Sequence, residues 1–315
     1  MFFDKYDLLV NPPNEVWNHL VQQIHDELSW KMSFHDYPSY MDGFGNDRFK
    51  FLVAVDSQTK KPAACLGGCH LPVENGSPQI FAIGMYYTHP DHRSSGLGRK
   101  MWEKLMEIAG GSNKFLNAAP VMSKKYAERS GFDKFAAWHL VTMVAQAKDC
   151  DTTKIEIHPS VKVVDFKEVE FEKVDKFDRT IGAGVPRGEF LKRWLTQDKA
   201  YNKFAVDESG EVVGYCNARI VYGNHILLSS FYANSPEIAS TLMRKTLESV
   251  PDLSSRNELV TYMSTENEAG KEIFKKMVKG DVNTERLMPR QFDTKAVNSP
   301  GTKVYGVTET DFNYI

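Results

Sequence analysis

The chain has 315 residues, of which 42% are hydrophobic and 25% are charged, and its formal net charge is −2. This length predicts about two domains, and the composition is that of a soluble globular protein. A net charge so close to zero gives no electrostatic case for nucleic acid or a membrane surface as a partner. No apolar run reaches the roughly 18 residues of a membrane span, and residues 1–7 lack the features of a signal peptide. We therefore expect a cytoplasmic protein.

In chain order, apolar periodicity in the first half predicts a strand, two helices and three strands. These elements are expected at residues 7–10, 12–28, 29–46, 49–56, 63–71 and 79–87, with polar turns at 57–60 and 74–77. A loop then leads into a helix that begins near Leu97 and ends at Gly110. After it we expect a short strand at 115–118, a helix at 122–130 and a long apolar strand at 135–145.

The cysteines give no sign of a metal site. Cys65, Cys69 and His70 are the one grouping that suggests zinc, but they lie in a predicted strand. In a strand, positions 65 and 69 are about 13 Å apart, which is too far for two ligands of one zinc ion. With Cys150 and Cys216 the chain has four cysteines, too few and too scattered for a disulfide framework. We expect neither a metal nor a disulfide scaffold.

The loop between the strand at 79–87 and the next helix contains Gly96 and Gly98, with basic residues at 93, 99 and 100. Glycines let an anion approach the backbone, and a helix N-terminus adds a positive dipole. The loop therefore predicts a cradle for phosphate or pyrophosphate. The alternative is a glycine-rich helix start with solvated charges. The spacing Arg-x-x-Gly-x-Gly matches neither a P-loop nor a dinucleotide-binding loop.

The segment from Thr88 to Gly98, with Pro90 ahead of Arg93, resembles the coenzyme A pyrophosphate loop of the GCN5-related N-acetyltransferase (GNAT) superfamily. The element order over residues 1 to about 148 is similar to the GNAT fold as well. The resemblance implies an N-acetyltransferase domain that binds acetyl-CoA. It assigns coenzyme binding to Tyr86, Tyr87, Thr88, Arg93, Ser94, Ser95, Gly96, Leu97, Gly98, Arg99 and Lys100.

The second half repeats the predicted order after a polar linker. Strands or helices are expected at 161–164, 174–181, 190–195, 203–207, 212–220, 225–232, 236–247, 259–263, 266–279 and 303–307. We therefore expect an α/β protein with two tandem GNAT folds, each a mixed, mostly antiparallel sheet flanked by helices. The expected limits are 1–148 for the acetyltransferase domain, 149–158 for the linker and 159–315 for a degenerate GNAT-like domain.

The second half lacks a cradle, because residues 232–240 contain no glycine and Glu237 at the helix start would repel a phosphate. Only one coenzyme site is expected. Tandem copies of this fold also imply a monomer that acts as an internal pseudo-dimer. Asp178, Arg187 and Arg219 are candidate substrate contacts from the second half.

The groups that handle protons are harder to identify from the sequence. GNAT enzymes often carry a carboxylate base on the fourth strand, but residues 80–87 contain none. The nearest titratable candidates are Glu74, His70 and His89. Tyr126 is the candidate acid, although the family's usual tyrosine position is here Ala127, about 100° away around the helix.

Two functions remain open. The leading prediction is an acyl-CoA-dependent N-acyltransferase that transfers acetyl from acetyl-CoA to a small amine. The alternative is a catalytically inactive coenzyme A-binding sensor or scaffold, because the strand carboxylate and the usual tyrosine are missing. Aromatic residues suggest a pocket for an apolar or aromatic amine, or else they close the core over the second helix. These residues are Trp30, Phe34, Tyr37, Tyr40 and Phe44.

Overall fold

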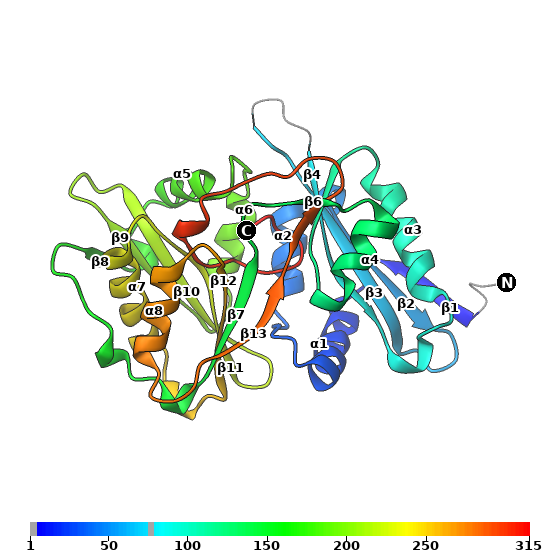
Figure 1. Ribbon diagram of the computed structural model, residues 1–315. Coiled ribbons are helices and arrows are strands. Elements are labelled where there is room, and N and C mark those ends of the chain that lie inside the picture. Colours follow the sequence, from blue (N-terminus) through cyan, green and yellow to red (C-terminus); the bar gives the residue numbers. More distant parts are fainter. Residues whose placement is uncertain (1–4, 75–78) are drawn as a thin grey trace.

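The structure is a computed structural model that describes residues 5–74 and 79–315. It contains two mixed, mostly antiparallel β-sheets with helices on both faces of each (Figure 1). The expected α/β fold class with two similar units is confirmed. Of the turn expected at 74–77, all but Glu74 lies outside the described residues.

The first sheet, as far as the structure describes the chain, has seven strands in the order β1-β2-β3-β4-β5-β14-β6. Neighbours are antiparallel except β4 and β5, which run parallel. The strands are β1 (Tyr6–Val10), β2 (Phe49–Asp56), β3 (Pro62–Leu71), β4 (Ile80–Thr88), β5 (Asn113–Asn117), β14 (Arg290–Phe292) and β6 (Lys134–Phe135).

The second sheet follows the same plan, with the order β8-β9-β10-β11-β12-β7-β13. Its central pair β11 and β12 is parallel, like β4 and β5, and β15 pairs with β11. The strands are β8 (Lys162–Val164), β9 (Ala200–Val206), β10 (Val212–Val221), β11 (His225–Ala233), β12 (Glu258–Ser264), β7 (Leu140–Gln146), β13 (Asn283–Met288) and β15 (Val304–Gly306). The repeated order predicted from the sequence is therefore present in the structure.

The two sheets exchange strands. β7 comes from the first half but lies in the second sheet, whereas β14 comes from the second half and lies between β5 and β6. The single strand expected at 135–145 is therefore wrong, because the segment is divided between two sheets. The division lies at Trp138, whose ring is buried 3.8 Å from the Arg290 guanidinium and whose Nε1 donates to the Ser299 carbonyl at 2.8 Å. The expected limits of the two domains remain a prediction from the sequence. The exchanged strands β7 and β14 each lie in the sheet of the other half.

Helices form a central layer between the sheets and an outer layer on each side (Figure 1). The central helices share one core cluster with the inner faces of both sheets, whereas α3 and α7 pack in separate clusters on the outer faces. The central helices are α1 (Asn14–Leu28), α2 (Asp36–Arg48), α5 (Phe171–Ile181) and α6 (Gly188–Leu195). The outer helices are α3 (Leu97–Ala109), α4 (Pro120–Ser130), α7 (Pro236–Glu248) and α8 (Glu268–Met277).

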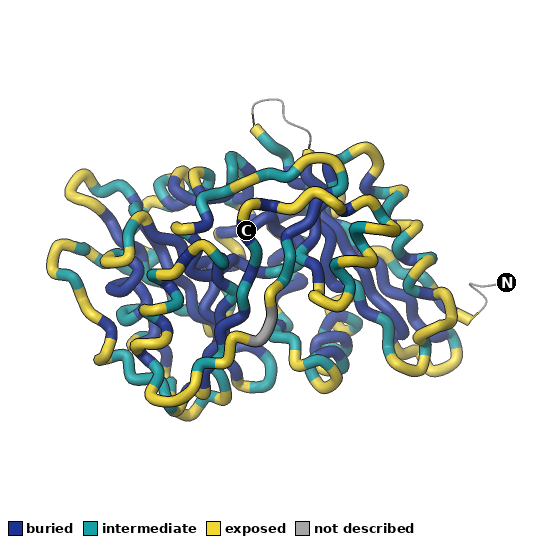
Figure 2. Tube along the Cα trace, viewed as in Figure 1, coloured by how far each residue is buried: buried dark blue, intermediate teal, exposed yellow. Residues whose placement is uncertain are grey.

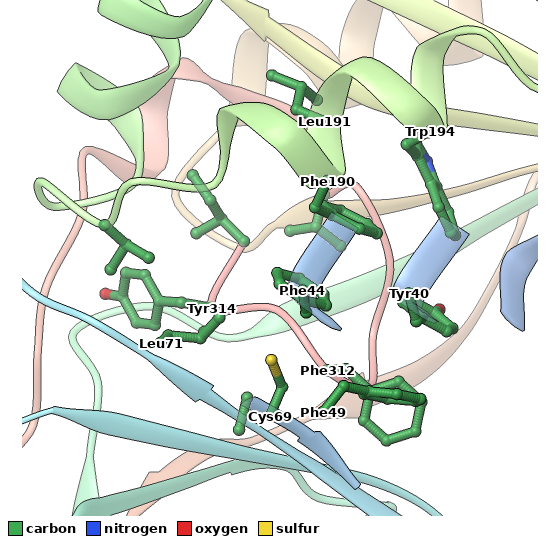
Figure 3. Packing of buried hydrophobic residues seen from close by; sticks show 14 of the residues in the cluster. Tyr40, Phe44, Phe49, Cys69, Leu71, Phe190, Leu191, Trp194, Phe312 and Tyr314 are labelled. Atoms are coloured by element: carbon green, nitrogen blue, oxygen red, sulfur yellow. The ribbon is translucent and has the colours of Figure 1, made fainter. Parts of the chain in front are cut away.

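Aromatic side chains join the two halves in the central layer (Figure 3). Phe44 of α2 stacks on Phe190 of α6 with 4.5 Å between ring centroids, and Tyr40 stacks on the same ring at 5.7 Å. Trp194 lies 5.2 Å from Phe190, and Phe312 meets Tyr40 edge-on at 5.0 Å. The halves therefore share one continuous core rather than a polar interface.

The strands of both sheets are largely buried, and exposed residues gather on loops and on the outer sides of helices (Figure 2). Much of residues 304–315 is buried too, although the segment has little regular structure beyond β15. None of the helices in the described part of the chain combines the length and the apolar character needed to cross a bilayer.

Candidate active site

The glycine loop connects the end of β4 to α3. Its first part is a 3-10 turn, η2 (Pro90–His92), preceded by His89, whose Nδ1 accepts from Asp91 N at 3.3 Å. Ser94 and Gly96 follow with φ of 61° and 82°, so the chain turns through the left-handed region twice before α3 begins. Gly96 is the N-cap of α3. The loop therefore presents a glycine backbone at the positive end of a helix dipole, where an anion is favoured.

Gly98 permits the first turn of α3 to approach β4 closely. A Cβ at this position would lie 3.1 Å from both Thr88 Oγ1 and Tyr86 Oη, which is tighter than ordinary carbon contacts. A larger side chain would push the start of the helix away from the strand. The glycine spacing thus fixes how the loop sits over the end of β4.

β4 and β5 separate before either strand ends. They pair only over residues 80–83 and 113–116, and a β-bulge then interrupts β4 on its β3 side at Met85 and Tyr86. Beyond the bulge, His89 N donates to Ala63 O of β3 at 2.8 Å. Because backbone groups alternate sides along a strand, the polar groups of Thr88 point the other way, toward the gap. One of them, the Thr88 carbonyl, accepts from Arg93 Nε at 3.0 Å.

Arg93 and Arg99 of the loop lie on its solvent side. The Arg93 side chain is half exposed and also pairs with Glu27 of α1. Arg99 is mostly exposed and its Nε lies 2.8 Å from Glu103 Oε1, one helical turn away. Glu27 also accepts from the Tyr87 hydroxyl at 2.6 Å, so α1, β4 and the loop are linked by one carboxylate.

A polar groove of about 540 Å³ opens beside this linkage, between α1, the β2–β3 turn and η2. Gln23 on its wall lies 3.4 Å from the Tyr87 hydroxyl, to which its Nε2 donates. The groove is lined by His19, Gln22, Gln23, Asp26, Thr59, Lys61, Pro62, His89, Asp91 and His92. It therefore borders the loop from the side of α1, opposite the gap between β4 and β5.

Tyr126 lies on the same side of the sheet as the glycine loop. Its ring stacks on Trp102 of α3 with centroids 5.4 Å apart, and Trp102 in turn lies 5.6 Å from Tyr86. Burial raises the pKa of the Tyr126 hydroxyl, which keeps it protonated. The predicted acid is thus close to the predicted coenzyme residues, and its catalytic role stays a prediction.

His70 and Glu74 lie away from that end of β4. His70 is opposite Phe81, five residues before Tyr86, which is about 17 Å along a strand. It lies 3.4 Å from Ser112 Oγ, and burial lowers its pKa. Glu74 forms an ion pair with Arg179 of α5 at the edge between the halves. The structure does not bring the three predicted catalytic residues together.

The predicted acceptor residues do not line one cavity. Tyr37 and Tyr40 are 2% and 3% exposed and belong to the central core, where the Tyr37 hydroxyl donates to Pro12 O at 2.7 Å. Phe34 is half-buried against Tyr222 of the second half, 5.5 Å between centroids, and Trp30 is likewise half-buried. Their contact with an acceptor stays a prediction.

Residues 309–313 pass over the inner face of the first sheet, from β5 across β4 to β3, and the sequence did not predict this. Met85 N donates to Asp311 Oδ1 at 2.9 Å, and Asn117 Nδ2 of β5 donates to Thr310 O at 2.8 Å. Phe312 lies 4.9 Å from Phe49, so the segment is anchored in the core (Figure 3). Two acidic residues close to apolar ones near the end of the chain were the signal that could have indicated it.

The two carboxyl groups of this segment lie near one another, with Glu309 buried and Asp311 half-buried. Burial raises the pKa of Asp311, and the Met85 N–H opposes that rise. Burial also raises the pKa of Glu309, and the charge of Asp311 raises it further. Two carboxylates in one desolvated space resist full ionisation, so the pair holds a proton at higher pH than isolated acids do.

In the second half, the helix start that corresponds to α3 is capped by a side chain and borders a small cavity of about 140 Å³, lined in part by Glu237. Ser235 caps α7 by accepting from Ile238 N at 3.4 Å. The segment that follows β7 packs on α7, where Ser240 Oγ donates to Glu156 O at 2.7 Å and His158 N donates to Thr241 Oγ1 at 3.0 Å. A second coenzyme at this position would have to displace these contacts.

The candidate substrate contacts of the second half are interior residues. Arg187 and Asp178 form a buried ion pair, with Nε donating to Oδ2 at 2.9 Å. Arg219 is 2% exposed, pairs with Asp36 of α2 and donates to Gln197 Oε1 at 2.7 Å. These charges join elements of the fold and are not open to a substrate.

Three solved structures with similar folds span nearly the whole chain. A candidate acetyltransferase from Pyrococcus horikoshii has 15% identity and a TM-score of 0.69, covering 99% of this chain and 98% of that one. A tandem GNAT protein from the clavulanic acid biosynthesis pathway has 12% identity and a TM-score of 0.61, with coverages of 91% and 98%. A GCN5-related N-acetyltransferase from Sphaerobacter thermophilus has 13% identity and a TM-score of 0.53, covering 95% of this chain and 98% of that one. At these identities the likeness concerns the fold.

Two family models match the sequence itself. The acetyltransferase (GNAT) family model matches residues 10–132, and an acetyltransferase (GNAT) domain model matches residues 174–306. No curated protein matches the chain. The two matches follow one another and agree with the two sheets. The chain therefore belongs to the GNAT superfamily and carries two GNAT domains in tandem.

Proposed function

We propose that the protein is an N-acyltransferase that transfers acetyl from acetyl-CoA to a small amine, with one coenzyme site in the first GNAT domain. Membership of the superfamily supports acyl-CoA-dependent N-acyl transfer in general. The observation that carries the proposal is the gap between β4 and β5 at the foot of the glycine loop. It combines a strand edge that β5 does not pair beyond Ile83 with an anion-binding helix start.

The residues present fit the coenzyme. The backbone from Ser94 to Arg99 would hold the pyrophosphate, because Gly96 leaves space and the α3 dipole favours negative charge. Arg93 and Lys100 would add positive charge nearby. The edge from Tyr86 to Thr88 would pair with an extended arm as a neighbouring strand does.

Acetyl-CoA, when bound, supplies an acyl group activated as a thioester. A backbone N–H on the β4 edge would polarise the thioester carbonyl, which makes the carbon more electrophilic. Tyr126, held protonated by burial, is the candidate proton donor to the departing sulfur. The second GNAT domain, which shares the core and exchanges a strand, would take the place of a partner subunit, so we propose a monomer.

The proposal is tested by acetyl-CoA binding and by thiol release. Calorimetry should find one site per chain, and replacing Gly96 and Gly98 by valine should weaken binding more than about tenfold, because side chains fill the cradle. The matched control is Gly111→Ala, where an added Cβ meets nothing within 4 Å. Two equivalent sites per chain, or unchanged affinity in the double variant, would overturn the assignment.

Thiol release should then be followed with a panel of small amines and amino acids, with products identified by mass spectrometry. Release that depends on an amine supports the transferase. Binding of acetyl-CoA without release for any acceptor would favour the alternative, a coenzyme A-binding sensor or scaffold.

A further inference from the structure

Residues 309–313 carry the acidic groups that β4 lacks. We propose that this segment, delivered by the second half of the chain, completes the acyl-transfer site, with Asp311 as the proton acceptor for the amine. The inference rests on the proposed function. It gives the second GNAT domain a direct part in catalysis, although that domain has no coenzyme loop of its own.

Asp311 is held at the point where β4 leaves β5. Its Oδ1 accepts from Met85 N at 2.9 Å, and Met85 has a φ of 56° within the β-bulge. The neighbouring residue, Tyr86, begins the open edge of the strand. Successive residues of a strand are about 3.3 Å apart, so the carboxylate lies next to the edge at which an acyl group would be held.

The absence of a side chain at Gly84 allows this contact. A Cβ at residue 84 would come within 2.3 Å of Asp311 Cβ and 2.5 Å of its Cα. The backbone of the segment therefore lies directly on β4. An acidic side chain of β4 itself could not occupy that space while the segment is in place.

Hydrogen bonds within the segment and packing in the core hold it in place. Glu309 accepts from Phe312 N at 2.9 Å and from Asn313 Nδ2 at 2.8 Å, which closes a turn around Asp311. Phe312 packs edge-on against both Tyr40 and Phe49 in the core (Figure 3). A carboxylate fixed in this way loses little entropy when it meets a substrate.

The surroundings favour a carboxyl group that exchanges a proton near neutral pH. Burial raises the pKa of Asp311 and of Glu309, and the two acids repel each other's charge. The titratable groups that interact electrostatically with the pair are Asp36 and Tyr40 of α2 and Cys65 and Cys69 of β3, and the charge of Asp36 raises the pKa of Asp311 further.

Other acids near the loop are committed elsewhere. Glu27 binds Arg93 and the Tyr87 hydroxyl. Glu74 pairs with Arg179, and His70 is opposite the start of β4. Of Glu27, Glu74, His70 and Asp311, only Asp311 is hydrogen-bonded to the bulge of β4 in the described part of the chain.

The acyl transfer needs only Asp311, Tyr126 and solvent to move its protons. Asp311 takes one proton from the ammonium form of the acceptor, and the freed lone pair of the amine attacks the thioester carbon. A C–N bond forms and the C–S bond breaks. The sulfur leaves with the bonding electrons and takes a proton from Tyr126 or water, while the second amine proton passes to solvent.

The first test locates Asp311 without needing an acceptor. Infrared difference spectra of the full chain are recorded on addition of acetyl-CoA, in the region of protonated carboxylic acids. Wild type should show a band change that is absent in Asp311→Asn and unaffected in Asp198→Asn, a matched change at an exposed turn. Binding with no band change would overturn this inference alone. No binding by wild type would overturn the proposed function as well.

The second test follows thiol release against pH with an acceptor from the amine panel. Asp311→Asn keeps an oxygen for the Met85 N–H, so acetyl-CoA should bind as in wild type while kcat/KM falls by about 10²–10⁴-fold. Wild-type activity should rise with pH as Asp311 loses its proton, and this rise should disappear in Asp311→Asn. Glu309→Gln removes a like charge and should move that rise to lower pH. Equal pH profiles in wild type and Asp311→Asn would refute the assignment.

If Asp311→Asn does not fold, Asp311→Glu answers the same question. This variant keeps the charge but moves the carboxylate by one methylene. It should therefore still bind acetyl-CoA, with a lower kcat and with activity that still rises with pH. Wild-type kcat in that variant would contradict a positioned base.

Discussion

Gly84 is the place where residues 309–313 lie directly on β4, so Gly84→Ala tests whether the two segments touch as described. The added Cβ would lie 2.3 Å from Asp311 Cβ. Non-bonded carbon atoms settle about 3.5–4.0 Å apart, so the segment would have to move by more than about 1 Å. A shift of that size breaks the 2.9 Å hydrogen bond from Met85 N to Asp311 Oδ1.

Two effects determine how far the free energy of unfolding falls in Gly84→Ala. Overpacking a well-filled site costs about 1–3 kcal/mol, and losing a hydrogen bond to a charged group costs about 1.5–3 kcal/mol. Because one movement causes both, we expect the free energy of unfolding to fall by about 2–5 kcal/mol in Gly84→Ala. Urea unfolding followed by tryptophan fluorescence measures the change. Thiol release should fall as well, because Asp311 is displaced, whereas acetyl-CoA affinity should change little.

Gly111→Ala is the control, since it makes the same chemical change where nothing lies within 4 Å of the added Cβ. Its unfolding free energy should stay within about 0.5 kcal/mol of wild type. If Gly84→Ala were as stable as Gly111→Ala and equally active, the segment would not rest on β4, and the proposed role of Asp311 would lose its geometric basis.

Three further outcomes follow from other contacts. Arg93→Ala should weaken acetyl-CoA binding less than the glycine changes, and part of its effect should vanish at high salt in calorimetry, because a half-exposed charge is screened. Asp178→Ala should lower the free energy of unfolding by about 3–5 kcal/mol, because it leaves Arg187 charged and buried; urea unfolding checks this. A fragment ending near residue 148 should aggregate or dimerise on size-exclusion chromatography, because it lacks β14 and carries β7 without its sheet. A monomeric, fully active fragment would contradict the shared core.

The sequence predicted most elements because their apolar periodicity is local. The strand at 79–87 and the helix from Leu97 show it clearly, and the second half repeats the order. The exchanged strands were missed for a physical reason. β14 has only three residues, and the separation of β6 from β7 depends on Trp138 packing under Arg290, a contact between residues far apart in the chain. Periodicity carries no information about which sheet a strand joins.

Some parts of the candidate site could likewise be predicted from the sequence, and others could not. The glycine loop was predictable because its conformation depends on its own residues, such as Gly96 at positive φ. Asp311 was not, since its position depends on the path of a segment more than 200 residues away from β4. Tyr40 shows a third case. Its helix could have lined a pocket or closed the core, and the choice is made by Phe190 of the second half, which periodicity in α2 cannot reveal.

The retention of a second GNAT domain without a coenzyme loop has a structural explanation. β14 fills the place between β5 and β6, so the first sheet is incomplete without the second half. Packing alone, however, would not require a carboxylate beside the bulge of β4, because a neutral amide at residue 311 could accept from Met85 N without the cost of desolvating a charge. A half-buried carboxylate next to a strand edge that no strand pairs is better explained by chemistry at that edge than by stability.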